Sequence, residues 1–264
     1  MSDVRFKVVI PARFDSSRLP GKVLLDIEGM PMLEHVYQRA VESGAEQIII
    51  ATDNEKVREV AEQFGATVCM TRTDHCSGTD RIAEVCEKLD WPDDSIIVNL
   101  QGDEPLIDPK LLTLVASNLQ QHPDASISTL CTPISTTEEL FDPNIVKVVM
   151  DHESNALYFS RAVMPWNRDE FATHSINNIP VDMVKDGMGH FRHIGMYCYR
   201  ADFLNAYSKM ESCELEKTEA LEQLRALWYG HKIQVSIIEE PPGHGVDTEQ
   251  DLQRVAEMIK ARQK

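Results

Sequence analysis

The stretch that decides the fold is Val8–Lys22, which reads VVIPARFDSSRLPGK. It begins with apolar residues that are typical of a buried β-strand. Pro11 ends this strand because proline has no N–H to donate to a sheet. The polar loop that follows contains three cations, Arg13, Arg18 and Lys22. Cations and backbone N–H groups after a first strand are what phosphate binding needs in an open α/β fold, so the stretch predicts a phosphate-binding loop.

The remainder of the first half alternates between the patterns of strands and helices. Short apolar runs at 47–51, 66–70 and 95–100 indicate strands, and between them apolar residues recur at helical spacing. Such alternation predicts right-handed βαβ crossovers and a mainly parallel sheet with helices on both faces. We therefore expect an α/β fold with a mainly parallel mixed sheet flanked by helices.

The second half is less regular. Runs at 145–150 and 156–159 indicate strands of an antiparallel ribbon, whereas 164–189 shows no period and is interpreted as a surface excursion. There are no repeats, low-complexity tracts or linker-like segments. We expect one domain spanning 1–264, with an insert at about 133–200.

Composition excludes several classes of protein. The 264 residues have a net charge of −17, which disfavours binding to nucleic acid or to anionic membranes. No apolar run approaches the roughly 20 residues of a spanning helix, so we expect no membrane insertion. The N-terminus leads directly into the first strand without the pattern of a signal peptide, and we expect a cytoplasmic protein. The six cysteines form no C-x-x-C pair and are interpreted as reduced thiols.

Two common nucleotide motifs are absent from the opening loop. A Walker A motif would need Gly at the position of Ser16 and Ser or Thr at that of Val23. The dinucleotide signature G-x-G-x-x-G is also missing, and with it the argument for a nicotinamide cofactor. An ordinary P-loop kinase or ATPase is therefore disfavoured.

Carboxylates follow the fourth strand and recur near the end of the chain. The stretch 99–105 reads NLQGDEP, in which Asp103 is a better ligand candidate than Glu104 because Glu104 precedes a proline. The stretch 243–248 reads GHGVDT, and its two glycines suit the return of Asp247 to a site, although helix capping is an equal alternative for that residue. Hard oxygen ligands at a sheet edge suit Mg²⁺, which takes one or two carboxylates plus substrate phosphate oxygens.

Several motifs together resemble one enzyme family. The opening IPARxxSxRLPGK, SGTDR at 77–81, VNLQGDEP at 98–105 and GVDT at 245–248 are similar to those of the CMP-Kdo synthetases, the 3-deoxy-manno-octulosonate cytidylyltransferases. The similarity continues through stretches at 146–149, 156–161, 192–197 and 221–225, so it covers essentially the whole chain.

The resemblance implies a fold, a reaction and an assembly. The fold would be a Rossmann-like nucleotidyltransferase fold with an inserted antiparallel subregion. The reaction would transfer CMP from CTP to 3-deoxy-D-manno-octulosonate (Kdo), giving CMP-Kdo and pyrophosphate for lipopolysaccharide synthesis, with Mg²⁺ as cofactor. Members of the family are usually homodimers.

The resemblance also implies a role for individual residues. Arg13 and Lys22 would hold the CTP phosphates, with Arg18 in support. Asp103 and Asp247 would bind magnesium. The implied catalytic residues are Arg13, Lys22, Asp103 and Asp247. Recognition of the cytidine would involve Ala12, Arg72 and Ser77. Contacts to the sugar acid would come from Gln101, Arg161, His193, Tyr197, Glu222 and Gln223.

The chemistry of these side chains agrees with the implied reaction. Attack by a sugar hydroxyl on the α-phosphate needs in-line positioning and charge neutralisation more than covalent catalysis. Arg161 offers a planar fork for the carboxylate of Kdo, and His193 is a donor whose charge the sequence leaves open. We expect a helix near 218–228 with Leu221, Leu224 and Trp228 buried, which would leave Glu222 and Gln223 facing a ligand.

Two rival functions and two departures stay open. The CMP-sialate synthetases have a Gly-Gly-Ser-Lys type sequence in the opening loop, where this chain has FDSSR at 14–18. A nucleotide-binding module without turnover would be expected to lack the metal carboxylates or the sugar-side residues, and this chain has both sets.

Cys76 stands where relatives usually have a polar residue or proline, and 167–189 is longer than usual, which puts the edge of the sugar pocket or the dimer surface in doubt.

Overall fold

The computed structural model describes residues 4–14, 19–75, 77–171, 189–243 and 245–262. Internal contacts divide the chain into two compact units. The first unit comprises Met1–Gln121, Met196–Lys209 and Pro242–Lys264, and the second unit comprises His122–Gly195 and Met210–Pro241. Within the expected insert, 133–195 belongs to the second unit, while the single domain spanning 1–264 stays a prediction.

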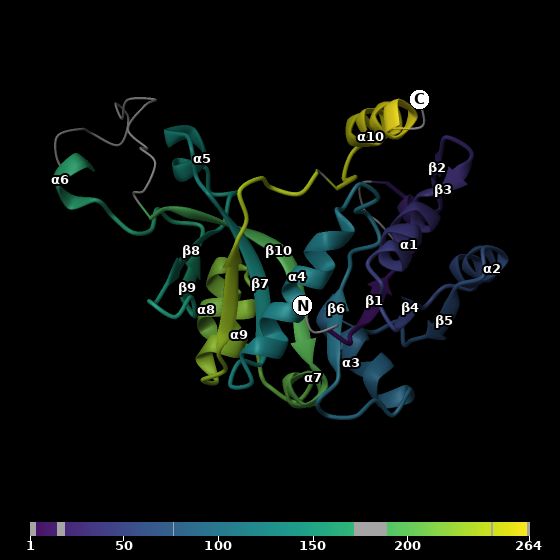
Figure 1. The fold of residues 1–264 in the computed structure, drawn as a ribbon, viewed down its shortest axis with the longest axis horizontal. Helices are drawn as coiled ribbons and strands as arrows, with labels where there is room; N and C mark the ends of the chain where they lie inside the picture. The colour runs from purple at the N-terminus through teal and green to yellow at the C-terminus, as the bar shows by residue number, and fades with distance from the viewer. Residues whose placement is uncertain (1–3, 15–18, 76, 172–188, 244, 263–264) are drawn as a thin grey trace. The chain divides into compact units, whose positions relative to one another are not determined.

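The first unit contains the predicted alternation of strands and helices (Figure 1). Its strands are β1 Lys7–Pro11, β2 Asp26–Ile27, β3 Met30–Pro31, β4 Gln47–Thr52, β5 Thr67–Met70 and β6 Ile96–Asn99, together with the second half of β10 Phe191–Arg200. Its helices are the 3-10 helix η1 Lys22–Leu24 and the α-helices α1 Met32–Glu42, α2 Glu55–Gln63, α3 Gly78–Lys88, α4 Pro109–Gln121, α7 Ala201–Tyr207 and α10 Glu249–Arg262.

The strand β1 is the centre of the sheet in the first unit. It pairs in parallel with β4 on one side and with β6 on the other, and β4 pairs in parallel with β5. The end of β10 pairs antiparallel with β6. Because Val8, Val9 and Ile10 are all 0% exposed, β1 is a fully covered strand, as its continuous apolar run predicts. The mainly parallel sheet flanked by helices is therefore confirmed.

Local signals set the helix ends where the sequence predicts them. The Asn54 side chain accepts a hydrogen bond from the Lys56 backbone N–H and caps α2. Gly65 has a φ of +83°, a left-handed conformation that ends the turn after α2. Pro109 is the first residue of α4, where its missing N–H costs no hydrogen bond.

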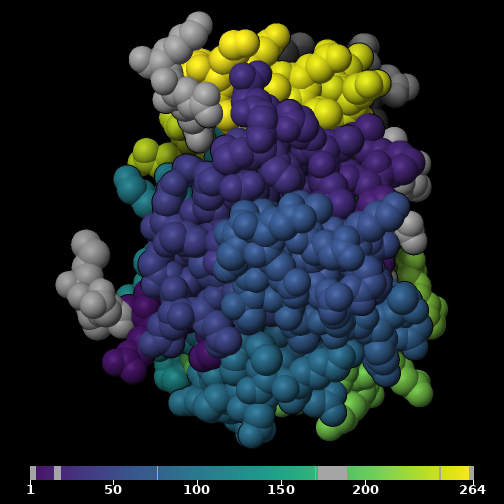
Figure 2. Space-filling model, turned by 90° about the vertical axis from the view of Figure 1, so that its right-hand side faces the viewer, coloured from purple at the N-terminus to yellow at the C-terminus, as the bar shows by residue number. Residues whose placement is uncertain are grey.

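The last helix returns to the N-terminal part of the first unit. Ile27 and Met32 pack with Val246, Val255 and Ile259 in one apolar cluster. In Figure 2, α10 (yellow) lies against the purple surface of the N-terminal segment. This packing brings the chain just before α10 back to the start of the fold.

The second unit contains the predicted antiparallel ribbon. Its elements are β7 Ile127–Pro133, α5 Thr137–Phe141, β8 Lys147–Met150, β9 Ala156–Ser160, α6 Arg168–Phe171, the first half of β10, α8 Glu214–Glu219, α9 Gln223–Trp228 and β11 Ile233–Ile237. β7 pairs in parallel with β11. β8 pairs antiparallel with β9 and with the start of β10, which confirms the ribbon.

The expectation of one helix near 218–228 is wrong. The chain leaves α8 at Ala220, which has a left-handed φ of +51°, and α9 begins only at Gln223. This break changes which side chains face inward: Leu224 is buried as expected, but Trp228 is 58% exposed. An alanine at a left-handed position gives no signal in the sequence.

Two expectations from composition can be compared with the described residues. None of the helices there is both long and apolar enough to cross a membrane. Cys69, Cys86, Cys131, Cys198 and Cys213 are free thiols, as the absence of paired spacing predicts. Cys76 lies outside the described residues, as do 172–188 of the long stretch at 167–189.

Candidate active site

Three loops of the first unit meet through close backbone contacts. A Cβ on Gly102 would lie 3.0 Å from the carbonyl oxygen of Pro11, and one on Gly245 would lie 3.2 Å from that of Asp103. The backbone N–H of Val246 donates to the same Asp103 oxygen at 2.8 Å. A Cβ at either position would push the neighbouring main chain away by a few tenths of an ångström, so glycine favours these close approaches. The loops after β1 and β6 and the segment before α10 are therefore held together by their main chains.

The opening loop places Lys22 between two carboxylates. Gly21 has a φ of +68° and precedes η1, whose first residue is Lys22. The Lys22 Nζ donates to Asp103 Oδ2 at 2.6 Å and to Asp247 Oδ1 at 3.2 Å. The lysine side chain is 12% exposed, and those of Asp103 and Asp247 are 31% and 53% exposed. The structure thus brings together three of the residues that the sequence predicts for this site.

The cap of α10 separates the two interpretations of Asp247. Thr248 Oγ1 accepts from the Asp251 N–H at 3.2 Å, while the Asp251 side chain accepts from the Thr248 N–H at 3.0 Å. This reciprocal pair is a capping box, so Thr248 and not Asp247 caps the helix with its side chain. The Asp247 side chain instead lies against Lys22.

The donor set at this site fits a hard divalent cation. The carboxylate oxygens of Asp103 and Asp247 both contact one positive charge, which in this structure is the Lys22 ammonium. Mg²⁺ is bound through one or two protein carboxylates, with phosphate oxygens and water completing its shell. Within the described residues no group of three or more His, Cys, Asp or Glu is placed to hold a metal by itself. Two carboxylates beside a phosphate loop suit an ion that arrives with a nucleotide.

Glu104 differs from its neighbour in charge. Burial, together with the negative charge of Asp103, raises the pKa of Glu104 to about 7. A carboxyl that is partly protonated near neutral pH is a poor ligand for a cation. Asp103 is therefore the carboxylate of this pair that suits a metal, as the sequence predicts.

The predicted cytidine residues lie on or beside the loop between β5 and α3. Arg72 is 68% exposed at its side chain, whereas Ala12 is 0% exposed and donates its backbone N–H to Ala51. The Ser77 hydroxyl accepts from the Asp80 N–H at 3.1 Å and caps α3. Ser77 thus has a structural role in addition to the predicted one.

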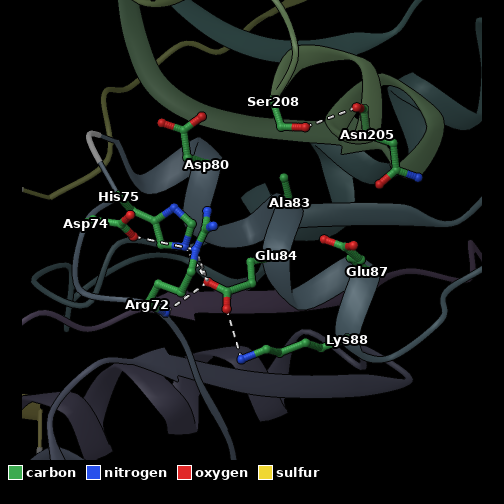
Figure 3. Close-up of a pocket in the computed structure, with 10 residues that line it drawn as sticks. All are labelled: Arg72, Asp74, His75, Asp80, Ala83, Glu84, Glu87, Lys88, Asn205 and Ser208. Atoms are coloured by element: carbon green, nitrogen blue, oxygen red, sulfur yellow. Dashed lines mark hydrogen bonds and ion pairs between the residues drawn. The ribbon is translucent and has the colours of Figure 1, made fainter.

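Arg13 joins the opening loop to the loop before α3. Its Nη2 donates to the carbonyl oxygen of His75 at 3.0 Å. The His75 ring contacts the carboxylate of Glu84, which also accepts from the backbone N–H of Arg72 (Figure 3). Arg18, the third predicted cation of the opening loop, lies outside the described residues.

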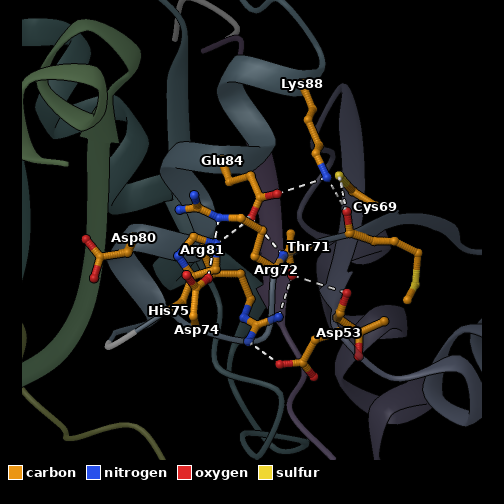
Figure 4. Close-up of polar contacts among 12 residues, drawn as sticks. Asp53, Cys69, Thr71, Arg72, Asp74, His75, Asp80, Arg81, Glu84 and Lys88 are labelled. Carbon is orange, nitrogen blue, oxygen red and sulfur yellow. Dashed lines mark hydrogen bonds and ion pairs between the residues drawn. The ribbon is translucent and has the colours of Figure 1, made fainter.

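A buried arginine, Arg81, contacts the start of the loop between β5 and α3. Arg81 is 0% exposed, donates to Asp53 Oδ2 at 2.6 Å and contacts the hydroxyl of Thr71 (Figure 4). Thr71 in turn donates its backbone N–H to the carbonyl of Thr52 at 2.8 Å. The last residue of the SGTDR motif therefore fixes the start of this loop to the end of β4.

Gln101 and Tyr197 lie in the first unit near the end of β6. Gln101 Nε2 donates to Asn99 Oδ1 at 3.3 Å. Tyr197 pairs with Asn99 across β10 and β6, and its ring stacks on Tyr199. Their contacts to a sugar acid stay a prediction.

In the second unit, backbone carbonyls hold Arg161. Its Nε donates to the Glu219 carbonyl at 2.8 Å, and its Nη1 donates to the Pro143 carbonyl at 3.0 Å. The Glu219 carboxylate accepts from the Arg161 backbone N–H at 3.0 Å and from the Ser160 hydroxyl at 2.5 Å. The carbonyls of Glu219 and Pro143 thus fix the orientation of the Arg161 guanidinium.

A second cation lies beneath Arg161. Lys147 is 0% exposed, and its Nζ donates to the carbonyls of Asp142, Ile145 and Arg161 at 2.7–3.1 Å. Burial lowers the pKa of Lys147, the charge of Asp142 opposes this shift, and the charge of Arg161 adds to it. Two neighbouring cations give this part of the second unit a positive potential that suits a carboxylate ligand.

His193 is a neutral side chain at physiological pH. Its Nε2 lies 3.0 Å from the Thr129 hydroxyl, and its ring packs edge-on against Phe159 at 4.8 Å. Burial lowers the pKa of His193 to about 3. Of the two charge states that the sequence leaves open, the structure therefore selects the uncharged imidazole.

The two predicted residues at the start of α9 differ in exposure. Glu222 is exposed and forms the N-cap of α9, where its carbonyl accepts from Arg225. Gln223 is only 8% exposed, so of the two side chains only that of Glu222 is open to solvent. Gln223 is the first residue of α9, which begins after the break at Ala220. Their roles in binding stay predictions.

Comparison with known proteins identifies the family. Residues 7–233 match the family described as "Cytidylyltransferase". The chain belongs to the cytidylyltransferase family.

Relatives within the family are similar over nearly the full chain. Proteins named 3-deoxy-manno-octulosonate cytidylyltransferase from Actinobacillus succinogenes and Coxiella burnetii are 52% and 50% identical to it, over 97% and 96% of this chain and 98% of each relative. The corresponding protein from Halorhodospira halophila is 50% identical over 99% of both chains.

A solved structure of a similar protein agrees with the fold. It is described as CMP:2-keto-3-deoxy-manno-octonic acid synthetase complexed with CTP. It is 39% identical, covers 98% of this chain and 99% of its own, and superposes with a TM-score of 0.85. The nucleotidyltransferase fold implied by the resemblance is therefore confirmed.

Sequence reasoning missed three residues that contact predicted site residues. Glu84 contacts Arg72 in the first unit, and Glu219 and Lys147 contact Arg161 in the second unit. Glu84 and Glu219 contact loop residues distant in sequence, and neither lies in a recognisable pattern. Lys147 gives the one usable signal, a single cation within the apolar run VKVV at 146–149. A lysine at such a position predicts a buried ammonium with several acceptors.

Proposed function

We propose that this cytidylyltransferase transfers CMP from CTP to Kdo, giving CMP-Kdo and pyrophosphate. The relatives at 50–52% identity are named 3-deoxy-manno-octulosonate cytidylyltransferase, and the similar solved structure is described as a complex with CTP. The observation within this chain that supports the proposal most directly is the convergence of Lys22, Asp103 and Asp247 at the ends of β1 and β6. This is the place where an open α/β sheet binds nucleotides.

The cations of the opening loop would bind the triphosphate. Lys22 would exchange its contacts with the two carboxylates for phosphate oxygens, and Arg13 would contribute a second positive charge. Arg18 is proposed to support them. Attack on the α-phosphate makes pyrophosphate the leaving group, and Lys22 and Arg13 would stabilise the charge that develops on it.

Asp103 and Asp247 would hold a magnesium ion. Bound there, the ion would neutralise phosphate charge and lower the pKa of the attacking sugar hydroxyl. The part of the two aspartates is to present oxygens from two loops whose backbones are already in contact. Such a fixed arrangement loses little conformational entropy on binding.

The sugar acid would be recognised by its carboxylate. Arg161 and Lys147 supply neighbouring positive charges, and the guanidinium is oriented by two carbonyls. Neutral His193 would interact with a sugar hydroxyl as an uncharged partner. Glu222, which is exposed, would accept a hydrogen bond from another hydroxyl.

The remaining proposals rest on the resemblance alone. They are that the enzyme works as a homodimer, in the cytoplasm, and that its product is used for lipopolysaccharide synthesis.

The decisive experiment is an assay of pyrophosphate release from CTP in the presence of Mg²⁺. Kdo, sialic acid or no sugar is added to parallel reactions. We expect release with Kdo only, and loss of release when EDTA removes the metal. Release with sialic acid but not with Kdo would move the chain to the CMP-sialate synthetases. CTP binding without release under any condition would indicate a module without turnover.

A further inference from the structure

The side chain of Glu84 lies at the bottom of a polar pocket of about 610 Å³ in the first unit, lined in part by Arg72, His75, Glu87 and Lys88. In Figure 3, Arg72, His75 and Lys88 all point toward the Glu84 carboxylate. The carboxylate is 9% exposed, whereas Glu87, one turn further along α3, is exposed. Neither the family resemblance nor the site described above assigns Glu84 a function.

Glu84 accepts hydrogen bonds from three directions. Its Oε2 accepts from the Arg72 backbone N–H at 3.0 Å and contacts His75 Nε2, and its Oε1 lies 2.9 Å from Lys88 Nζ. Burial by itself would raise the pKa of Glu84, but the hydrogen bonds from Lys88, His75 and Arg72 lower it to about 2. The carboxylate is therefore ionised at every pH at which the enzyme would work.

The partners of Glu84 lie on the loop that contains the proposed cytidine residues. Thr71 is fixed to Thr52 at one end of that loop, and Ser77 caps α3 at the other. Between these ends, Glu84 holds the main chain at Arg72 and the ring at His75. Lys88 also donates to the Met70 carbonyl at 2.7 Å, so it joins Glu84 to the end of β5.

The same loop contacts the phosphate side of the site. The His75 carbonyl accepts from Arg13 Nη2, while the His75 ring, only 3% exposed, is held by Glu84. The orientation of the His75 peptide thus depends on the Glu84 side chain, which contacts His75, Arg72 and Lys88. A shift at Glu84 would change the positions of both Arg72 and Arg13.

We propose that Glu84 is a positioning residue for the nucleotide: it holds Arg72 and His75 so that Arg72, Ser77 and Arg13 are presented together to CTP. This inference rests on the proposed function, because it takes CTP as the ligand of that loop. It extends the proposed function by assigning nucleotide selectivity to a buried carboxylate behind the site. Glu84 acts through its partners and is not itself a catalytic residue.

The test is a double-mutant cycle on CTP affinity, measured by calorimetry. Glu84→Gln loses the charge and replaces one acceptor by a donor, so we expect CTP binding to weaken roughly tenfold. Arg72→Ala is expected to weaken it as well, and the double variant should be no weaker than the weaker single variant, because both changes remove one arrangement. Glu87→Gln, on the same helix and lining the same pocket, is the matched control and should bind as the wild type does.

Steady-state kinetics give a second readout. Glu84→Gln should raise KM for CTP by a similar factor, leave kcat within about threefold, and reduce the preference for CTP over UTP. A residue that only stabilises the fold would lower the yield of folded enzyme without changing this preference. If Glu84→Gln does not fold, His75→Gln, which keeps the carbonyl that Arg13 uses, replaces it in a cycle with Arg13→Ala, and the same coupling is expected.

The outcomes separate this inference from the proposed function. A wild-type chain that binds no CTP overturns both. If Arg72→Ala weakens CTP binding but Glu84→Gln does not, or if their effects are additive, the positioning role is overturned and the proposed function stands. Non-additive loss together with reduced CTP preference supports the inference.

Discussion

Lys22 in the first unit and the neighbouring Lys147 and Arg161 in the second unit contact different kinds of acceptor. In the first unit, Lys22 contacts the side-chain carboxylates of Asp103 and Asp247, both of which are partly exposed. In the second unit, Lys147 and Arg161 contact backbone carbonyls. A carboxylate can rotate to release a cation when a ligand arrives, but a backbone carbonyl cannot leave without moving the chain. The first arrangement therefore suits exchange with phosphate and metal, and the second suits a fixed receptor for an anion.

This contrast predicts that replacing Lys147 mainly affects stability. Lys147→Met would remove the ammonium from three partly buried carbonyls, and we expect the free energy of unfolding to fall by about 3 kcal/mol, measured by urea denaturation. The matched control is Lys232→Met, which removes an exposed lysine paired with Asp124 in the same unit and should leave the stability almost unchanged. Equal losses in the two variants would contradict the comparison.

Replacing the aspartates of the first unit should instead affect turnover. Asp103→Asn and Asp247→Asn are each expected to reduce kcat by about 10², or roughly 2.7 kcal/mol of transition-state stabilisation, because each removes a charge that would hold magnesium. Their melting temperatures should stay close to that of the wild type. Asp108→Asn, in the same loop region, serves as the control. Near-wild-type turnover in both variants would refute the proposed metal role.

A smaller and more selective effect is expected for Arg161. Arg161→Ala removes the proposed partner of the sugar carboxylate, so kcat/KM for Kdo should fall roughly 30-fold, which corresponds to about 2 kcal/mol. CTP affinity, measured by calorimetry without sugar, should be unchanged. If CTP affinity fell equally, Arg161 would belong to the nucleotide side.

The last prediction concerns pH. The pKa of His193 is about 3 in the folded protein, below the ordinary value of 6.5, so the unfolded chain binds a proton more readily. Stability from this residue is thus complete above pH 6.5 and is lost as pH falls, by about 1.4 kcal/mol per pH unit, until pH approaches 3. His193→Gln should flatten the pH dependence of unfolding by this amount between pH 6.5 and 4.5. His152→Gln, at an exposed position of the second unit, controls for loss of a histidine, and an unchanged slope in His193→Gln would contradict the prediction.

The parts of the molecule that the sequence predicts are those with local causes. Apolar runs that end at Pro11 or Asn99 locate the strand ends, and parallel pairing then places Lys22 and Asp103 at one sheet edge. The return of Asp247 is suggested by its glycines but depends on the packing of α10 against Ile27 and Met32, which involves residues more than 200 positions away.

The parts that the sequence does not predict depend on single backbone angles or on distant partners. The left-handed conformation of Ala220 splits an expected helix, although alanine favours helix continuation. Glu84 resembles an ordinary solvated helix carboxylate until its partners on the preceding loop are known. In both cases tertiary contacts override a sound local expectation.

The glycine contacts among the three loops have a consequence for engineering. Because a Cβ on Gly102 or Gly245 would lie only 3.0 or 3.2 Å from a backbone carbonyl oxygen, any larger residue there would push the neighbouring loop away by a few tenths of an ångström. A library designed to change nucleotide or sugar preference should therefore keep both positions constant and vary the exposed side chains at Arg72 and Glu222. Diversity at those two positions would vary side chains that are proposed to contact the ligands, while the backbone contacts at Gly102 and Gly245 are kept.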